Sequence, residues 1–413
     1  MRTRLWIVLV TGILICGLAI GTVSALSIST AWKTVSPGGQ PMKGITISGD
    51  GSRVLVSSNT MGLSSDGKNV WGGYDSGIAA MSDDGNYVVT ATGTSIRMLD
   101  RTGSAIWSCS MGYPVSAVAI SPNGSLVATA DTSGYIRTWG NLGESYGTVQ
   151  MDPASDLGIV PSADLVVIAS DRGLRYINPG LDLVWSDNRT DSLDTVIVIP
   201  PEGSAIYTAG GGRVSSHSKD GTLNWQKQVT SQPITDISCS GNGNVIVVGS
   251  QDGTVYILDS AGTTRAKYPA GQWINAVGVS RDGTLIAAGS IDSKLALLSR
   301  DGTLSGSTKT SSIIQPRSVA VNPDGSRVVV SDQTTLYGFK ISPDPVLTTP
   351  TSRVRTTTGQ TTIETPGADL TMPDEEMTTE IPDTTPAPTQ SPPAAATGIL
   401  ALGLVLVFRK RSQ

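Results

Sequence analysis

The feature that most constrains this chain is a repeat. A tight turn with the pattern x-Asp/Asn-Gly, followed by an apolar run that ends in small residues, returns about every 40 residues between residues 48 and 332. Asp-Gly and Asn-Gly pairs permit the positive φ that a tight hairpin turn needs. The apolar runs, such as 245–250, are expected of strands covered on both faces. Seven of the eight turns contain a glycine, namely Gly51, Gly85, Gly124, Gly203, Gly243, Gly283 and Gly325. Ala163 takes the place of the glycine in the remaining turn, between Gly124 and Gly203.

A period near 40 residues with four short strands per period predicts the blades of a β-propeller. The third strand of a repeat follows a second turn, and the fourth strand follows a glycine turn and often carries tryptophan, as at Trp71, Trp107, Trp185 and Trp225. Their shared position favours packing between blades over a ligand platform. Eight turns predict eight blades. Seven remains the alternative, because the first interval, from Gly51 to Gly85, is short.

The last repeat contains only three strands, whereas a spare strand at 28–35 precedes the first. Pairing 28–35 with 334–340 would complete the last blade and leave no open sheet edge. We therefore predict an all-β, eight-bladed propeller of four-stranded antiparallel blades, closed by the N-terminal strand. In this arrangement Trp32 is expected to be buried beside Tyr337 or Phe339.

Composition supports strands and excludes one class of partner. Gly is abundant at 47 residues, and Glu occurs between residues 30 and 345 only as Glu144 and Glu202. Such usage favours strands and turns over helices. The net charge is −5 and no long basic patch is present, so we expect no nucleic-acid partner.

The two ends differ in composition from the body. Residues 1–25 have the pattern of a secretory signal peptide, with cleavage after Ala25 or retention as an anchor as the alternatives. After the propeller, residues 26–345, a Thr/Pro-rich stalk is predicted at 346–393. An apolar helix at 394–408 and a basic tail at 409–413 follow, which predicts a membrane anchor with the tail in the cytoplasm and the body outside the cell. The sequons at Asn123 and Asn188 are candidate glycosylation sites, and Asn188 is the better one.

Three resemblances follow from these residues. Third strands that end in Leu99-Asp100, Trp139-Gly140 and Leu258-Asp259 resemble WD repeats. The Asp-Gly-x-x-x-Trp elements resemble pyrroloquinoline-quinone-type propellers, and the stalk, apolar helix and basic tail resemble the anchors of archaeal surface proteins. The Pro-Gly-Phe tripeptide of the best-known anchors is missing, as is the Gly-His dipeptide of WD repeats. Both repeat families imply a propeller scaffold and leave the function open.

We expect no catalytic site, no metal site and no cofactor in this chain. His217, the one histidine, lies in a polar stretch that predicts a surface position. Cys16 falls in the leader, and Cys109 and Cys239 are predicted to be unpaired, partly because the repeat places them far apart. Asp-rich turns are explained by turn geometry and lack the ligand spacing of a calcium loop. A quinone-dependent dehydrogenase stays as the enzyme alternative, although the few glutamates and the lack of vicinal cysteines speak against it.

Propellers present the loops between a fourth strand and the next first strand on one face, around the mouth of a central channel. These loops carry the candidate binding residues Tyr74, Asp75, Tyr113, Trp273, Asn275 and Arg317, with Pro114 and Gln315 nearby. Aromatic side chains and arginine are the usual anchors of interfaces. The sequence therefore predicts a cell-surface scaffold that binds a protein or glycan ligand, with a structural envelope component as the alternative.

Overall fold

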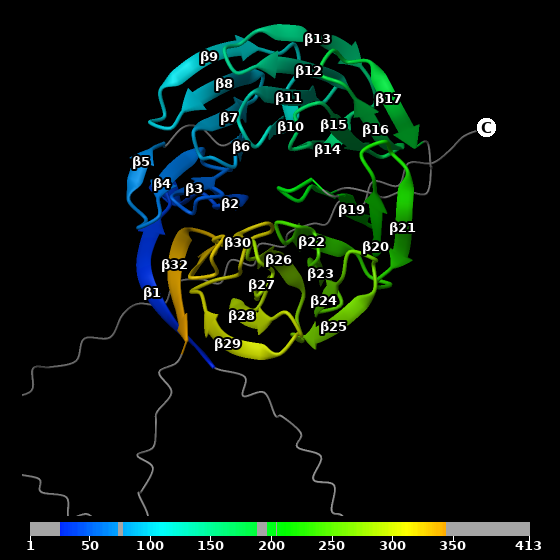
Figure 1. Cartoon of the computed structure of the whole chain (residues 1–413). Coiled ribbons are helices and arrows are strands. Elements are labelled where there is room, and N and C mark those ends of the chain that lie inside the picture. Colours follow the sequence, from blue (N-terminus) through cyan, green and yellow to red (C-terminus); the bar gives the residue numbers. More distant parts are fainter. Residues whose placement is uncertain (1–24, 73–76, 188–195, 204, 344–413) are drawn as a thin grey trace, which may run out of the picture. The chain divides into compact units, whose positions relative to one another are not determined.

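The fold is that of a closed ring of eight β-sheets, seen in a computed structural model (Figure 1). The structure describes residues 25–72, 77–187, 196–203 and 205–343. Within them every sheet has four antiparallel strands in sequence order from the channel outward, except the last, whose order from the channel outward is β30-β31-β32-β1. The predicted eight-bladed propeller is confirmed, and the seven-bladed alternative is wrong.

The first half of the ring follows β1 (Leu26–Val35) and the short 3₁₀ helix η1 (Pro37–Gly39). Blade 1 contains β2 (Ile45–Ile47), β3 (Arg53–Val56), β4 (Met61–Ser64) and β5 (Asn69–Trp71). Blade 2 contains β6 (Ile78–Met81), β7 (Tyr87–Thr92), β8 (Ser95–Asp100) and β9 (Ala105–Ser110). Blade 3 contains β10 (Val115–Ile120), β11 (Leu126–Asp131), β12 (Tyr135–Gly140) and β13 (Ser145–Gln150). Blade 4 contains β14 (Ala154–Ile159), β15 (Val166–Ser170), β16 (Gly173–Ile177) and β17 (Leu183–Asp187).

The second half continues the same pattern. Blade 5 contains β18 (Val196–Val198), β19 (Ile206–Gly210), β20 (Arg213–His217) and β21 (Leu223–Gln228). Blade 6 contains β22 (Ile234–Cys239), β23 (Ile246–Ser250), β24 (Thr254–Leu258) and β25 (Thr264–Pro269). Blade 7 contains β26 (Ile274–Val279), β27 (Leu285–Ser290), β28 (Lys294–Ser299) and β29 (Leu304–Lys309). Blade 8 contains β30 (Val319–Val321), β31 (Arg327–Ser331), β32 (Thr335–Pro343) and β1.

The turns between first and second strands have the predicted backbone. The seven predicted glycines have φ between 63° and 74°, and Ala163 has a φ of 57°. In the turn of blade 7 the Ser280 hydroxyl donates to Asp282 and accepts from the amide of Leu285, at 2.6 and 3.0 Å. Local side-chain chemistry therefore sets the spacing of the repeat.

Ring closure occurs as the sequence predicts. β1 pairs antiparallel with β32, from Leu26 opposite Pro343 to Val35 opposite Thr335. The two strands lie side by side although they come from opposite ends of the propeller sequence (Figure 1). Because β1 covers the outer edge of β32, blade 8 has the same four strands as the other blades.

The expected surroundings of Trp32 were wrong. Trp32 is half-buried and pairs with Gly338, so its indole lies on the face of the sheet opposite to Tyr337 and Phe339. Successive residues of a strand point to opposite faces, which is the reason for the difference. Tyr337 and Phe339 stack on each other at 5.8 Å in the core shared with blade 7. The Trp32 Nε1 donates to the Ser65 carbonyl of blade 1 at 3.1 Å.

The outer-strand tryptophans connect neighbouring blades, as the repeat predicts. Each ring lies over the glycine in the third-to-fourth-strand turn of the following blade. The pairs are Trp32 with Gly67, Trp71 with Gly103, Trp107 with Gly143, Trp185 with Gly221, and Trp225 with Gly262. Between blades 3 and 4 the large and the small residue exchange places. Gly147 stands at the tryptophan position of blade 3, and Leu181, with a φ of 72°, stands at the turn position of blade 4. One large and one small residue thus fill each of these contacts.

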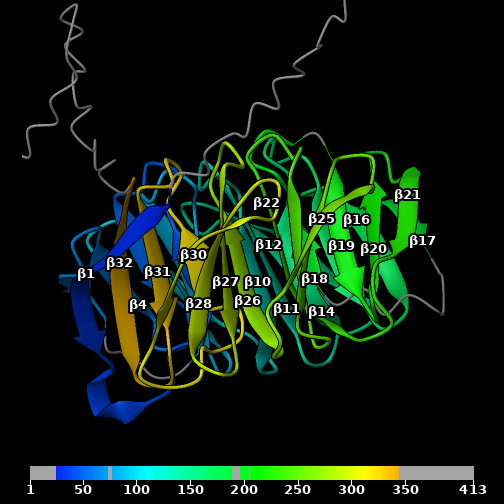
Figure 2. The ribbon, with the colours of Figure 1, turned by 90° about the horizontal axis from the view of Figure 1, so that it is seen from below.

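The ring has two distinct faces, seen edge-on in Figure 2. We call the face with the first-to-second and third-to-fourth strand turns the turn face. The opposite face is the loop face, which carries the second-to-third strand turns and the connections from each outer strand to the next blade. Leu26 pairs with Pro343 at the beginning of β1 and the end of β32, so both ends of the described propeller lie on the turn face.

His217 is a second correction, because it is fully buried at the end of β20 and not at the surface. Third strands are covered by both neighbouring blades. The ring of Trp185, in blade 4, packs on the imidazole with the two ring centroids 5.9 Å apart. Cys109 and Cys239 are free thiols in blades 2 and 6. Burial raises the pKa of Cys239 to about 12, which disfavours the thiolate form.

The predicted leader up to residue 24, the stalk, the apolar segment 394–408 and the basic tail lie outside the described residues. In the part of the chain that the structure describes, no helix has the length and apolar character to cross a membrane.

Candidate functional site: the loop face and the channel mouth

A cavity of about 500 Å³ lies where the first strands of the blades surround the axis of the ring. Its walls are mostly small or aliphatic residues, since first strands must pack closely around the channel. Among the described residues of this lining, three carry charged side chains, namely Asp156 in β14, Asp236 in β22 and Arg317 just before β30. They come from blades 4, 6 and 8, so they approach the axis from alternate blades.

The two aspartates bridge neighbouring blades. Asp236 accepts from the amide of Ile237 at 3.0 Å and from the amide of Val277, in blade 7, at 2.9 Å. Asp156 makes the same pair of contacts, with Leu157 and with Ile197 of blade 5. Burial raises the pKa of Asp236 to about 7, although its amide donors and the Arg317 charge act in the opposite direction. Sequence reasoning missed both residues, and an aspartate inside an otherwise apolar first strand was the available signal.

This arrangement predicts that stability falls as pH rises from 5 to 8. The folded-state pKa of Asp236, about 7, lies above its ordinary value of 3.8, so the folded state binds more protons than the unfolded state between these values. Burial raises the pKa of Asp156 too, which adds in the same direction. We expect a higher urea midpoint at pH 5 than at pH 8, with an effect on the order of 1–3 kcal/mol. Asp236→Asn should reduce this difference, and an unchanged difference in the variant would contradict the assignment to Asp236.

The mouth of the channel carries a ring of equivalent positions. In the blades where it is described, the residue eight places before the turn glycine or Ala163 stands where the chain enters a first strand on the loop face. In blades 3, 4, 6 and 7 this residue is small or uncharged and polar, namely Ser116, Ser155, Thr235 and Asn275. In blades 8 and 1 it is cationic, namely Arg317 and Lys43. The two cations therefore occupy matching positions in adjacent blades.

The structure places the candidate binding residues as follows. Tyr113 is exposed on the loop face and stacks on Tyr135 of β12, with ring centroids 6.0 Å apart. Trp273, in the connection to blade 7, is 50% exposed. Tyr74 and Asp75 lie outside the described residues, as does Asn188. Asn123 lies in the first turn of blade 3 and accepts from the Ser125 amide, as expected from its turn position.

Trp273 and Arg317 belong to one local group on the loop face, whereas Tyr113 lies in blade 3, on the other side of the ring. We call this group the mouth sector and define it as Lys43, Trp273, Asn275, Ile313 and Arg317. The Arg317 amide donates to the Asn275 carbonyl at 3.3 Å, and the Arg317 carbonyl accepts from Ile45 of blade 1 at 3.0 Å. The Asn275 amide group donates to the carbonyl of Ile314 at 2.9 Å. These bonds fix the backbone of blades 7, 8 and 1 around the exposed side chains.

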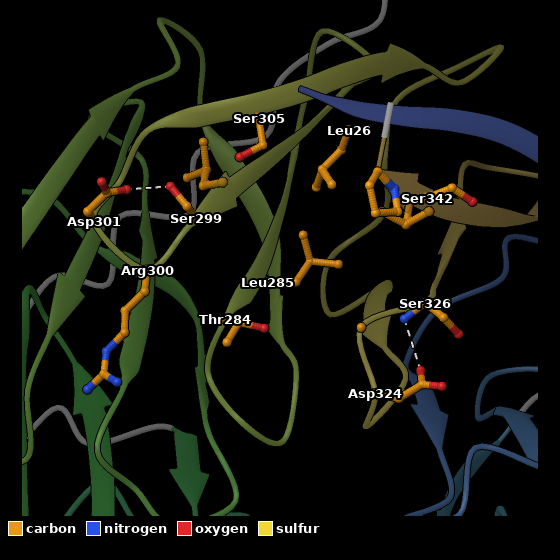
Figure 3. Close-up of a pocket in the computed structure, with 14 residues that line it drawn as sticks. Leu26, Thr284, Leu285, Ser299, Arg300, Asp301, Ser305, Asp324, Ser326 and Ser342 are labelled. Atoms are coloured by element: carbon orange, nitrogen blue, oxygen red, sulfur yellow. Dashed lines mark hydrogen bonds between the residues drawn. The ribbon is translucent and has the colours of Figure 1, made fainter. Parts of the chain in front are cut away.

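A second cavity, of about 700 Å³, opens on the turn face between blade 7 and the closing strands (Figure 3). Its apolar lining includes Leu26, Leu285 and Ile341. It exists because β32 continues straight to Pro343 where every other blade makes a third-to-fourth-strand turn. Ser299 and Ser326 on its rim are hydrogen-bonded to Asp301 and Asp324, the aspartates of their own turns.

Among the described residues no three His, Cys, Asp or Glu side chains gather as a metal site would require. The turn aspartates accept hydrogen bonds from residues of their own turns, and Asp220 is an example. It accepts from the Ser218 hydroxyl and the Thr222 amide, and these bonds hold its pKa below the ordinary value.

The fold defines this chain as a β-propeller that contains a WD-type repeat. Residues 104–140 match the family described as WD domain, G-beta repeat. Residues 207–364 match the family described as lambda-carrageenase beta-propeller domain. No curated protein matches the chain.

Solved propellers share the fold at low sequence identity. The C-terminal WD40 domain of Sif2 is 16% identical, with a TM-score of 0.65 over 76% of this chain and 98% of that one. The computationally designed Ika8 protein is 18% identical, with a TM-score of 0.61 over 74% and 98%. The Cps50 (Swd1) propeller of Myceliophteria thermophila is 13% identical, with a TM-score of 0.50 over 64% and 95%. Such identities establish the architecture alone.

Proposed function

We propose that this protein is a non-catalytic binding module that takes a glycan or protein ligand at the mouth sector of its loop face. The observation that carries the proposal is that Trp273 and Ile313, at 50% and 41%, and Arg317 are all exposed on the connections that enter the adjacent blades 7 and 8. Aromatic residues and arginine dominate the energy of interfaces. A tryptophan with few rotatable bonds, on a backbone that is already fixed, loses little conformational entropy when a ligand binds.

A glycan is the ligand that we favour. The flat indole of Trp273 can pack against the apolar face of a sugar ring, and the neighbouring amide and guanidinium groups can bind its hydroxyls. The match to a lambda-carrageenase propeller domain spans residues 207–364 and therefore includes Trp273, Asn275 and Arg317. A protein ligand at the same residues is the other outcome of the test.

The proposed location is the outer surface of the cell. Residues 1–25 have the pattern of a signal peptide and residues 394–408 that of an anchor. β32 ends at Pro343 on the turn face, so the chain leaves the described propeller on the side away from the loop face. Release of the propeller by protease added to intact cells would support this location, whereas full protection would contradict it.

The binding proposal predicts that Trp273→Ala weakens ligand binding at least tenfold, an effect typical of an interface anchor. Full-length protein and variant would be compared on glycan and protein arrays. Leu142→Ala is the matched control, since Leu142 is 71% exposed but lies in a turn of blade 3 on the turn face. Equal binding by the Trp273 variant would refute the proposed site. Recovery of only lattice components from envelope extracts would favour the structural alternative.

A further inference from the structure

We infer that the ligand of the mouth sector is an anionic glycan, held by Lys43 and Arg317. This inference rests on the proposed function and names the charge of its ligand. It starts from the connections between outer strands and the next first strands, which surround the channel mouth. In the described residues these connections contain three charged side chains, Lys43, Asp152 and Arg317.

The acidic member of this set is already neutralised. Asp152 forms ion pairs with Arg172 at 3.1 Å and with Arg175 at 2.5 Å. Arg317 and Lys43 are exposed, and neither forms an ion pair with a carboxylate of the described residues. Within the described connections, the charge left without a carboxylate partner is therefore positive and lies in blades 8 and 1.

The carboxylates near Arg317 are hydrogen-bonded to groups other than its guanidinium. Asp156 and Asp236 line the channel together with Arg317; burial raises the pKa of both while the Arg317 charge acts to lower it, and each carboxylate accepts from two backbone amides. The other loop-face aspartates of the described residues lie in second-to-third strand turns, except Asp187, which ends the outer strand β17. Asp332, for example, accepts from the Tyr337 hydroxyl at 2.9 Å and from the Thr335 amide at 2.8 Å.

Backbone hydrogen bonds hold Arg317 and Lys43 at the channel mouth. Arg317 has a φ of 53°, a left-handed conformation that is uncommon for a residue other than glycine. Its amide and carbonyl are bonded to blades 7 and 1, at Asn275 and Ile45. The Lys43 amide donates to the Ser58 hydroxyl at 2.8 Å. Strained, over-determined backbone of this kind is found where a side chain must be presented in one place.

Together these features fit an acidic sugar chain. Trp273 offers an apolar platform for a ring, while the guanidinium of Arg317 and the ammonium of Lys43 can each hold a carboxylate or sulfate. Equivalent positions in adjacent blades place the two cations in sequence around the mouth, as a polymer with repeated charges requires. An acidic peptide has the charge but lacks the sugar ring that the indole would cover.

The test uses matched probes on the full-length protein. Oligogalacturonate is compared with its neutral methyl ester, dextran sulfate with dextran, and hexaglutamate with hexaglutamine. We expect the acidic glycans to bind, binding to weaken at high salt, and Arg317→Gln or Lys43→Gln to lower affinity about tenfold each. Lys219→Gln, a control on the exposed turn face, should leave affinity unchanged.

Each other outcome has a definite meaning. Binding of hexaglutamate as tight as that of the acidic glycans would overturn the glycan assignment. Trp273-dependent binding that is equal for neutral and acidic probes would overturn the role of charge and leave the proposed function standing. Absence of Trp273-dependent binding to every glycan and protein tested would refute the proposed function itself.

Discussion

Deletion of residues 26–36 is expected to abolish the folded ring or to remove most of its stability. β1 is the fourth strand of blade 8, and its pairing with β32 runs from Leu26 to Val35. Without it, β32 exposes a row of unpaired backbone groups, which promotes edge-to-edge aggregation. We expect an insoluble product, or a loss that is a large part of the roughly 5–15 kcal/mol by which a domain is typically stable. Solubility, circular dichroism and urea unfolding would measure the effect.

Two further variants make this experiment specific. Trp32→Ala keeps the pairing and should cost about 3 kcal/mol, because the indole packs on Gly338 and Gly67 and donates to Ser65. A permuted chain that carries residues 26–36 after Pro343, joined by an Asp-Gly turn, recreates an ordinary blade and should fold. A deletion variant as stable as the parent would show that the ring does not depend on β1.

Gly221→Ala is expected to destabilise the propeller by about 3–5 kcal/mol, through strain and a clash together. Gly221 has a φ of 87°, and a Cβ there would lie 2.2 Å from the Trp185 ring. The ring would have to leave its place over the next blade, so that its packing between blades 4 and 5 would be lost. Urea unfolding of the variant measures this cost.

The clash and the backbone strain can be separated. Gly271→Ala is the matched control, since Gly271 has a φ of 90° but nothing within 4 Å of an added Cβ. It should cost only about 1 kcal/mol. In a Trp185→Ala background the Gly221 substitution should likewise cost about 1 kcal/mol, because the ring is gone. Additive effects of the two substitutions would refute the proposed contact between Trp185 and Gly221.

The sequence by itself determined the elements whose causes are local. Asp-Gly and Asn-Gly turns require a backbone that few residues adopt, so their recurrence fixed the blade length and number, and Ala163 was recognised by its place in the series. The spare strand at 28–35 was identified by counting strands, and an open sheet edge is unfavourable enough to require closure. The shared position of the tryptophans was visible for the same reason.

Only the tertiary structure decided what surrounds each side chain. His217 lies in a polar stretch, yet the adjacent blade buries it under Trp185. Trp32 could have faced either side of its sheet, and the register with Gly338 decided which. Asp236 reaches an amide of the next blade, a contact that no local pattern encodes.

The candidate site shows the same division. The loops that carry Trp273 and Arg317 lie between repeats and can be located from the sequence, whereas Lys43 stands before the first complete repeat. Closure of the ring brings blade 1 against blade 8, where the Ile45 amide donates to the Arg317 carbonyl, and so brings the Lys43 connection next to that of Arg317, which lies far along the chain. A repeat specifies each blade from its own turns, but the ring alone determines which blades become neighbours across the ends of the chain.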